Sequence, residues 1–187
     1  MPNQYLPRPI VHDWSEDIGK NTEAHQAALS RLLKDQRRLT RWLEENAENM
    51  EGGTGGVAAY LFGVVARMFD LAGGRMRKAT WEQVRQAERS IGGAAGSLLP
   101  FDASFPDRVR KIEWRAQPHI LDEALMSLFE REPTEEEEDL DTTEAGKIFF
   151  LLWVATEVID QNWTPAKDTE LLETYEYLHI EPMKKEG

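Results

Sequence analysis

Hydrophobic residues recur at helical spacing along most of the chain, and in two segments they cover nearly every side. Residues 57–71 and 148–159 are apolar almost all round, which is typical of helices buried in a core. Each is shorter than the roughly 20 apolar residues that a membrane-spanning helix needs. We therefore expect an all-α single domain: an irregular bundle of about seven helices, with these two in contact at its centre, and no sheet.

Capping residues and glycines predict where the other helices begin and end. Apolar residues over 21–50 indicate one long helix with a basic opposite face. The glycine-rich run 52–56 is interpreted as a connection between helices, because a phosphate-binding loop would follow a strand and end in Lys-Ser or Lys-Thr. Gly73 and Gly74 are expected to end the first central helix.

Similar signals continue beyond residue 80. Thr80 and Gln83 form a capping-box pattern that opens a helix whose buried stripe includes Trp81, and Gly92-Gly93 is expected to end it.

Three further helix N-termini are predicted nearer the C-terminus of the chain. Asp107 is expected to cap a short helix over 107–114, Pro118 suits the first turn of the next, and Thr164-Pro165 opens the last.

The two ends of the chain are expected to be less regular. Pro7 and Pro9 discourage helix, which predicts an irregular N-terminal arm over residues 1–20. The helical domain then covers 21–180, and residues 181–187 form a frayed tail.

The amino-acid composition excludes several kinds of functional site. The 187 residues include no cysteine, which excludes disulfides, thiolate catalysis and metal sites with Cys ligands. The N-terminus has no basic region leading into an apolar stretch, so we expect no signal peptide, and a cytoplasmic, prokaryotic setting. None of the four histidines has a partner at the spacing of metal ligands, and no nucleophile-elbow motif occurs. We expect no cofactor and no bound metal.

The net charge of -12 is unevenly distributed. Residues 1–100 hold 13 Lys and Arg against 12 Asp and Glu, whereas residues 101–187 hold 9 against 22. This balance disfavours nucleic acid as the main ligand, since phosphate binding needs a clustered basic face. It favours a protein partner with a basic surface. We expect no association with a membrane.

One basic cluster lies around the predicted helix start at Thr80, and its members are Arg75, Arg77, Lys78, Arg85 and Arg89. We interpret it as pairing with the acidic half of the same chain, with an external anionic partner as the alternative. A nucleic-acid site would need exposed aromatic side chains among the cations, and the one candidate, Trp81, is expected in the core.

An acidic segment is the strongest candidate for binding. Residues 130–144 hold nine acids against one base, Arg131, and the following helix is expected to begin at Asp141 or Thr142. The segment lacks the glycine and the alternating oxygen ligands of an EF-hand loop, so calcium is disfavoured. The alternatives are a solvated connection and a docking strip for a basic partner. The predicted partner-binding residues are Glu135, Glu136, Glu137, Glu138, Asp139 and Asp141.

Paired carboxylates suggest one alternative function. Glu44, Glu45 and Glu48 follow an EExxE pattern, and Glu157 with Asp160 follows ExxD, so each set shares a helix face that could hold Mg²⁺. All-α nucleotide pyrophosphohydrolases use such pairs on consecutive helices. Here more than 100 residues separate the two patterns, and no family resemblance follows. We therefore predict a non-enzymatic interaction or regulatory subunit, with a metal-dependent nucleotide pyrophosphohydrolase as the alternative.

Overall fold

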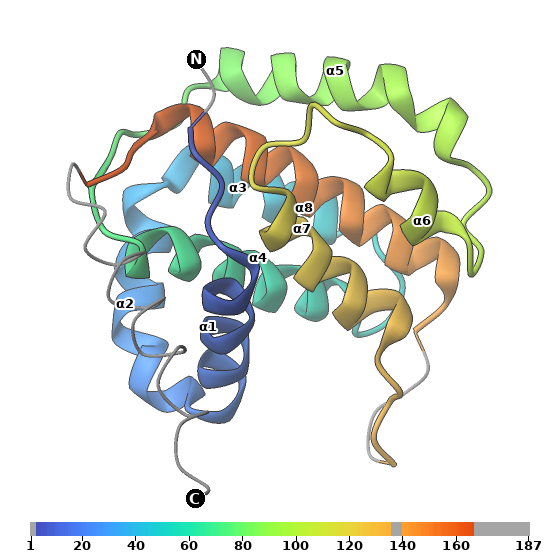
Figure 1. Cartoon of the computed structure of the whole chain (residues 1–187), viewed down its shortest axis with the longest axis horizontal. Helices are drawn as coiled ribbons and strands as arrows, with labels where there is room; N and C mark the ends of the chain where they lie inside the picture. The colour runs from blue at the N-terminus through green and yellow to red at the C-terminus, as the bar shows by residue number, and fades with distance from the viewer. Residues whose placement is uncertain (1–2, 136–139, 167–187) are drawn as a thin grey trace, which may run out of the picture.

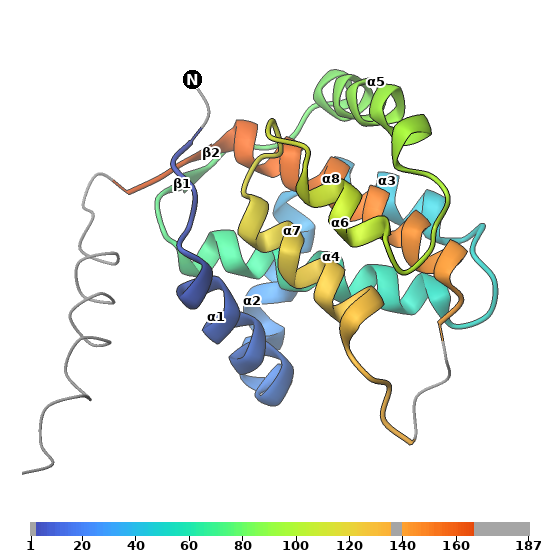
Figure 2. The ribbon, with the colours of Figure 1, turned by 45° about the vertical axis from the view of Figure 1, so that its right-hand side comes forward.

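A computed structural model describes residues 3–135 and 140–166 of the chain (Figures 1 and 2). In chain order the elements of this part are α1 (Arg8–Lys20), α2 (Thr22–Asp35), α3 (Arg37–Ala47), α4 (Thr54–Leu71), β1 (Arg75–Met76), α5 (Trp81–Leu98), α6 (Phe105–Arg110), α7 (Pro118–Leu125), the π-helix η1 (Met126–Glu130), α8 (Thr142–Asn162) and β2 (Trp163–Thr164). The prediction of an all-α single domain is confirmed.

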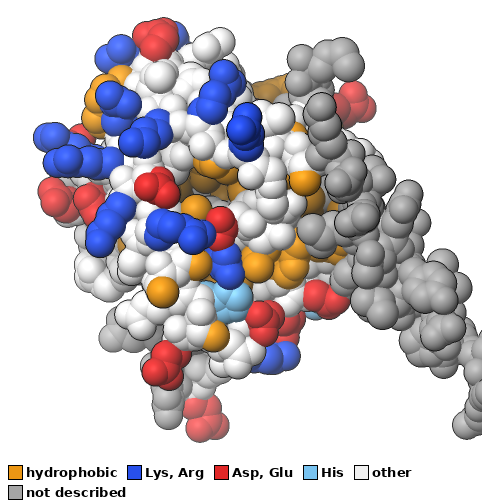
Figure 3. Space-filling model, turned by 90° about the vertical axis from the view of Figure 1, so that its left-hand side faces the viewer, with side chains coloured by type: hydrophobic (Ala, Val, Ile, Leu, Met, Phe, Trp, Pro, Cys, Tyr) orange, Lys and Arg blue, Asp and Glu red, His pale blue; other side chains and the backbone are white. Residues whose placement is uncertain are grey.

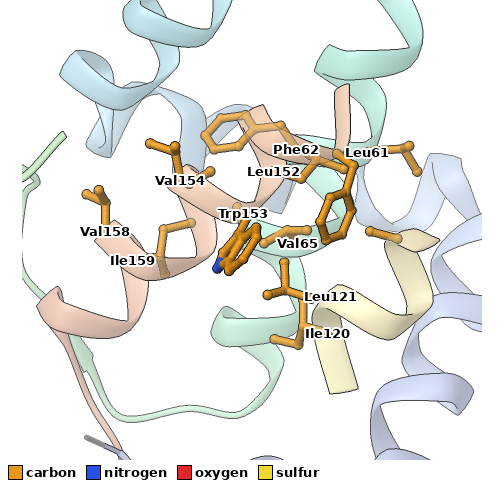
Figure 4. Packing of buried hydrophobic residues seen from close by; sticks show 14 of the residues in the cluster. Leu61, Phe62, Val65, Ile120, Leu121, Leu152, Trp153, Val154, Val158 and Ile159 are labelled. Atoms are coloured by element: carbon orange, nitrogen blue, oxygen red, sulfur yellow. The ribbon is translucent and has the colours of Figure 1, made fainter. Parts of the chain in front are cut away.

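Helices α4 and α8 pack together at the centre of the bundle, as their apolar sequences predict. Their side chains share one cluster, in which Phe62 and Val65 come from α4 and Leu152 and Trp153 from α8 (Figure 4). The side chains of Phe62 and Trp153 are 1% and 0% exposed. By length and composition α4 could cross a membrane, but here it packs against α1, α2, α3 and α8 as a core helix does.

The irregular arm expected over residues 1–20 is wrong, because most of this stretch is helix α1. Pro7 is the N-cap residue and Pro9 lies in the first turn, where the backbone N–H has no helical partner, so neither proline opposes the helix. Val11 and Ile18 are fully buried and fix α1 to the core.

The single helix predicted over 21–50 is also wrong, because α2 and α3 separate at Gln36. The buried side chain of Gln36 reaches the segment after β1, where its Oε1 accepts from the N–H of Ala79 at 3.0 Å and its Nε2 donates to the carbonyl of Arg77 at 2.9 Å. Glutamine favours helix, so no local signal marks this break. The tertiary hydrogen bonds that Gln36 makes produce it.

The glycines on either side of α4 have distinct roles. The helix already begins at Thr54, so the connection predicted over the glycine run is shorter than expected. Gly55 passes close to α3, where an added Cβ would lie 2.8 Å from the carbonyl oxygen of Ala47. Gly73 and Gly74 follow the end of α4, as predicted, with φ of 74° and 88°.

Helix α5 opens with the predicted capping box of Thr80 and Gln83. It does not end at Gly92 and Gly93 but continues to Leu98. The side chain of Leu98 is 2% exposed, so its burial offsets the weak helix propensity of the two glycines.

Helix α6 begins at Phe105, two residues before the predicted cap at Asp107, and it ends well before Trp114. Phe105 is fully buried and Pro106 occupies the first turn. The next helix, α7, has Pro118 in its first turn, as predicted.

The expectation of no sheet needs a small correction, because β1 and β2 form a two-residue antiparallel pair. Arg75 lies opposite Thr164, and Met76 lies opposite Trp163. The pair joins the chain after α4 to the C-terminal end of α8. The last predicted helix beyond Thr164-Pro165 and the predicted tail fall almost entirely outside the described residues.

Candidate functional site

The acidic segment, residues 130–144, lies between η1 and α8 in the chain, and its described residues 131–135 extend away from the packed helices (Figures 1 and 2). Glu132 and Glu135 are exposed and form no ion pair or hydrogen bond within the described part of the chain. Four of the predicted binding residues, Glu136, Glu137, Glu138 and Asp139, lie outside the described residues.

Three other acids of this segment are held by the fold. Glu130 accepts two hydrogen bonds from Arg110 at 2.7 and 3.0 Å, which lower the pKa of its carboxyl. Asp141, a predicted binding residue, caps α8 by accepting from two main-chain N–H groups at 3.1 and 3.2 Å. Glu144 is buried with one oxygen on Lys147 Nζ at 2.5 Å and the other without a partner. The segment is thus anchored at both ends, and Glu132 and Glu135 between these anchors face solvent.

The ExxD carboxylates are tied to the loop before α7. Glu157 Oε1 accepts from the N–H of Ala116 at 2.8 Å and from Trp153 Nε1 at 3.1 Å. Burial raises the pKa of Glu157. Asp160 accepts from Gln117 Nε2 at 2.9 Å, and Gln117 itself has a φ of 43°. These bonds give both carboxylates a structural role in fixing a strained loop residue.

The EExxE carboxylates lie elsewhere, with Glu44 and Glu45 on α3 and Glu48 at its C-cap, along an open groove that also involves the end of α2. Glu45 pairs with Arg41 at 2.8 Å. Within residues 3–135 and 140–166 no group of three acidic or histidine residues is arranged to hold a metal ion. The two carboxylate patterns therefore do not combine into the metal site that the alternative function requires of them.

A chain of polar side chains, buried only at His25, joins α1, α2 and α4, and the sequence patterns did not indicate it. Arg67 Nε donates to His25 Nδ1 at 3.0 Å, so the proton of His25 is on Nε2, which donates to Asp17 at 2.8 Å. This hydrogen bond from His25 is the largest cause of the lowered pKa of Asp17. Arg67 also pairs with Asp70, which accepts two hydrogen bonds from Arg31 at 3.1 Å. The five residues lie on three helices, so no local motif marks them.

The other two histidines in the described part of the chain are the exposed His12 and the half-buried His119. His12 contacts Glu123 at 3.0 Å and joins α1 to α7. Burial lowers the pKa of His119, whose Nδ1 is buried without a hydrogen-bond partner.

Lys and Arg side chains gather on the upper part of one face of the molecule (Figure 3). Exposed cations lie on α3, on β1 and the residues after it, and on the first half of α5. The side chain of Arg38 reaches the carbonyl of Ala79, which places α3 against the segment after β1. We call the exposed cations of these three elements the basic face, and they are Arg37, Arg38, Arg41, Arg75, Arg77, Lys78, Arg85 and Arg89.

The pairing that we expected between the basic cluster and the acidic half is wrong for the described residues. Arg85 and Arg89 pair with Glu82 of their own helix, at 3.3 and 3.2 Å. Five cations of the basic face have no carboxylate partner in residues 3–135 and 140–166. They are Arg37, Arg38, Arg75, Arg77 and Lys78.

Trp81 also lies differently from the prediction. Its side chain is 36% exposed instead of buried. The side of α5 that faces the core carries Val84 and Ala87, and Trp81 lies at the edge of that side. Trp81 and Arg85 are four residues apart and so share one side of α5. The basic face therefore includes an aromatic side chain.

Comparison of the chain with family models, with curated proteins and with solved structures finds no match in any of the three.

Proposed function

We propose that the protein is a non-enzymatic helical interaction subunit of a cytoplasmic complex, and that its acidic segment binds a partner with a basic surface. The observation that carries the proposal is the position of the described part of the segment: residues 131–135 extend away from the helices (Figure 2), and Glu132 and Glu135 are exposed and make no ion pair within the described part of the chain. Nine acids with one base in fifteen residues repel one another.

Repulsion among these acids does not stabilise the fold. The ion pairs that an exposed carboxylate can make are worth at most about 1 kcal/mol each. Attraction of a basic surface is a use for such a segment, because complementary charge speeds association and excludes partners of like charge. The body of the domain supports this use by fixing both ends of the segment, through the Arg110–Glu130 pair and the Asp141 cap.

The test is quantitative capture from a lysate of the native host, with wild type and a variant that carries Gln at positions 135–138. Basic proteins should be retained by wild type and lost with the variant, and added salt should release them. A matched control replaces exposed acids elsewhere, Glu16, Glu23, Glu48 and Glu113, by Gln, and it should capture as wild type does. Equal capture by wild type and the 135–138 variant would refute the proposal.

A further inference from the structure

The exposed charges of α3 are sorted along the helix. Leu39, Trp42 and Leu43 bury one side of α3 in the core. Every exposed residue between positions 37 and 48 is charged, with bases in the first half and acids in the second. We call these residues the α3 face, and they are Arg37, Arg38, Arg41, Glu44, Glu45 and Glu48.

This order of charges destabilises the helix that carries it. The helix dipole favours acids near the N-terminus and bases near the C-terminus, whereas α3 has no acid in its first turn and no base in its last. Arg37 and Arg41 are like charges four residues apart, as are Glu44 and Glu48, and such pairs repel. Within the described part of the chain the face makes one ion pair, between Arg41 and Glu45 at 2.8 Å, in the less favourable order of base before acid. The fold therefore gains little from these charges, and a contact outside the fold would account for them.

We propose that the α3 face binds the same face of a second copy of this chain, with the two helices antiparallel. Antiparallel contact places the basic half of each helix against the acidic half of the other. The face is thus complementary to itself, as a two-fold symmetric interface requires. The positive end of each helix dipole also lies beside the negative end of the other. This inference goes beyond the proposed function, because it uses no residue of the acidic segment.

One register of the two helices satisfies both halves of the face. In an antiparallel pair, each step forward on one helix is a step back on the other. The step from Arg37 to Arg41 equals the step back from Glu48 to Glu44, so Arg37 faces Glu48 in the same register in which Arg41 faces Glu44. Two-fold symmetry produces each of these pairs twice, and no like charges face each other. Arginine suits such pairs because its N–H donors match the geometry of a carboxylate.

An open groove along the α3 face gives the second helix a place to lie. The groove is lined by the α3 face except Arg38, by Thr40, and by residues of α2, which are Ser30, Leu33 and Lys34. Leu33 is half-buried against the core and adds an apolar side chain to the groove. Lys34 adds a base beyond Arg37, at the end of the groove that receives the acidic half of the second α3 in this register.

The net charge of the whole chain allows this contact at moderate salt. A charge of -12 repels a second copy, but the Debye length at about 0.1 M salt is about 10 Å, so distant charges are largely screened. Side chains that pair across the interface are closer than this and still attract. At about 1 M salt the length falls to about 3 Å, and the pairs are screened as well. Because exposed ion pairs are individually weak, we expect a dimer in exchange with monomer.

Charge reversal tests the contact by loss and recovery. The acidic variant carries Arg37→Glu with Arg41→Glu, and the basic variant carries Glu44→Arg with Glu48→Arg. Each has an α3 face dominated by one sign, so self-association should weaken more than about tenfold. Their mixture should form a heterodimer, because faces of opposite sign meet. A variant with all four substitutions is self-complementary again and should dimerise as wild type does.

Sedimentation velocity at about 100 µM protein and about 0.1 M salt should show dimers of wild type, of the fourfold variant and of the mixture, and monomers at about 1 M salt. A control with Arg8→Glu and Lys111→Glu changes the net charge as the acidic variant does, at exposed positions outside α3, and should still dimerise. All reversed positions are exposed, and the new charges agree with the helix dipole, so circular dichroism should show every variant folded.

Single cysteines test the antiparallel order, since the chain has none of its own. Arg37→Cys and Glu48→Cys proteins, mixed and treated with a bismaleimide reagent, should give cross-linked dimers. Arg37→Cys alone should give few, because at a rise of about 1.5 Å per residue the two copies of position 37 are about 16 Å apart along the helices.

A wild type that stays monomeric at about 0.1 M salt would overturn the inference. So would two reversed variants that still dimerise alone, or whose mixture forms no heterodimer. Cross-linking of Arg37→Cys alone, as efficient as that of the mixture, would overturn the antiparallel arrangement. Capture of basic proteins through residues 135–138 is measured independently of all these outcomes, so failure of this inference leaves the proposed function standing.

Discussion

Replacement of Phe62 by Ala tests the central packing on which the rest of the fold depends. The ring of Phe62 is 1% exposed and lies in the cluster that α4 shares with α8 (Figure 4). Removal of a buried phenylalanine ring costs both its transfer free energy and the cavity left behind, about 3–5 kcal/mol in all. At about 2–4 °C of melting temperature per kcal/mol for a chain of this size, the midpoint should fall by roughly 10 °C.

Tyr60 provides the matched control, because it lies on the same helix with 45% of its side chain exposed. Tyr60→Ala should cost less than about 1 kcal/mol, as surface substitutions do. Urea denaturation followed by circular dichroism measures both variants and shows whether the dependence on denaturant is unchanged. If the two substitutions cost the same free energy of unfolding, the central position of α4 is wrong.

Three further changes test local features of the fold. Asp141→Ala should lower the free energy of unfolding by about 1 kcal/mol, while Asp141→Asn, which keeps a capping oxygen, should change it little in the same urea assay. Gly74→Ala should lower the free energy of unfolding by more than about 1 kcal/mol, because the φ of Gly74 is 88° and a Cβ would lie 2.3 Å from the carbonyl oxygen of Thr164. Gly93→Ala is the control: Gly93 lies within α5 with open space around it, so this substitution should raise the melting temperature. Burial raises the pKa of Glu157 above its usual 4.5, so the stability that this group contributes is full below that pH and is lost as pH rises through the folded value. Glu157→Gln keeps the acceptor oxygen, so its gain in unfolding free energy over wild type should grow from pH 4 to pH 7; a constant difference would contradict the assignment.

The elements that sequence predicted correctly are those whose cause is local. All-round apolarity placed α4 and α8 at the centre, and the Thr80–Gln83 pair marked the start of α5. Each of these signals lies within a few residues of the feature that it specifies. The same holds for Gly73 and Gly74, which adopt positive φ angles directly after the end of α4.

The elements that sequence missed depend on contacts across the fold. The break at Gln36 requires the main chain near Ala79, which is 43 residues away. Helix α1 forms despite two prolines because its apolar residues pack into the core. Trp81 is exposed because a different side of α5 faces the core. Helical spacing alone does not determine whether Trp81 or its neighbours in the sequence lie on the buried side.

The candidate surfaces show the same division. The acidity of residues 130–144 is visible in the sequence, but the roles of Glu130 and Asp141 as anchors of the segment depend on Arg110 and on the start of α8. The basic cluster is visible as well, yet its proximity to the cations of α3 requires the fold, because Gln36 and Arg38 reach the main chain of Arg77 and Ala79 only when α3 packs against the segment after β1.

Helix α8 makes these two charged surfaces independent of each other. The acidic segment leads into its N-terminus, and its C-terminus leads into β2, which pairs with β1 of the basic face. It is buried along most of its length by apolar side chains, so it cannot bend to bring its ends together without loss of the core. A rigid core helix therefore keeps opposite charges about 30 Å apart, beyond the range at which screened charges interact.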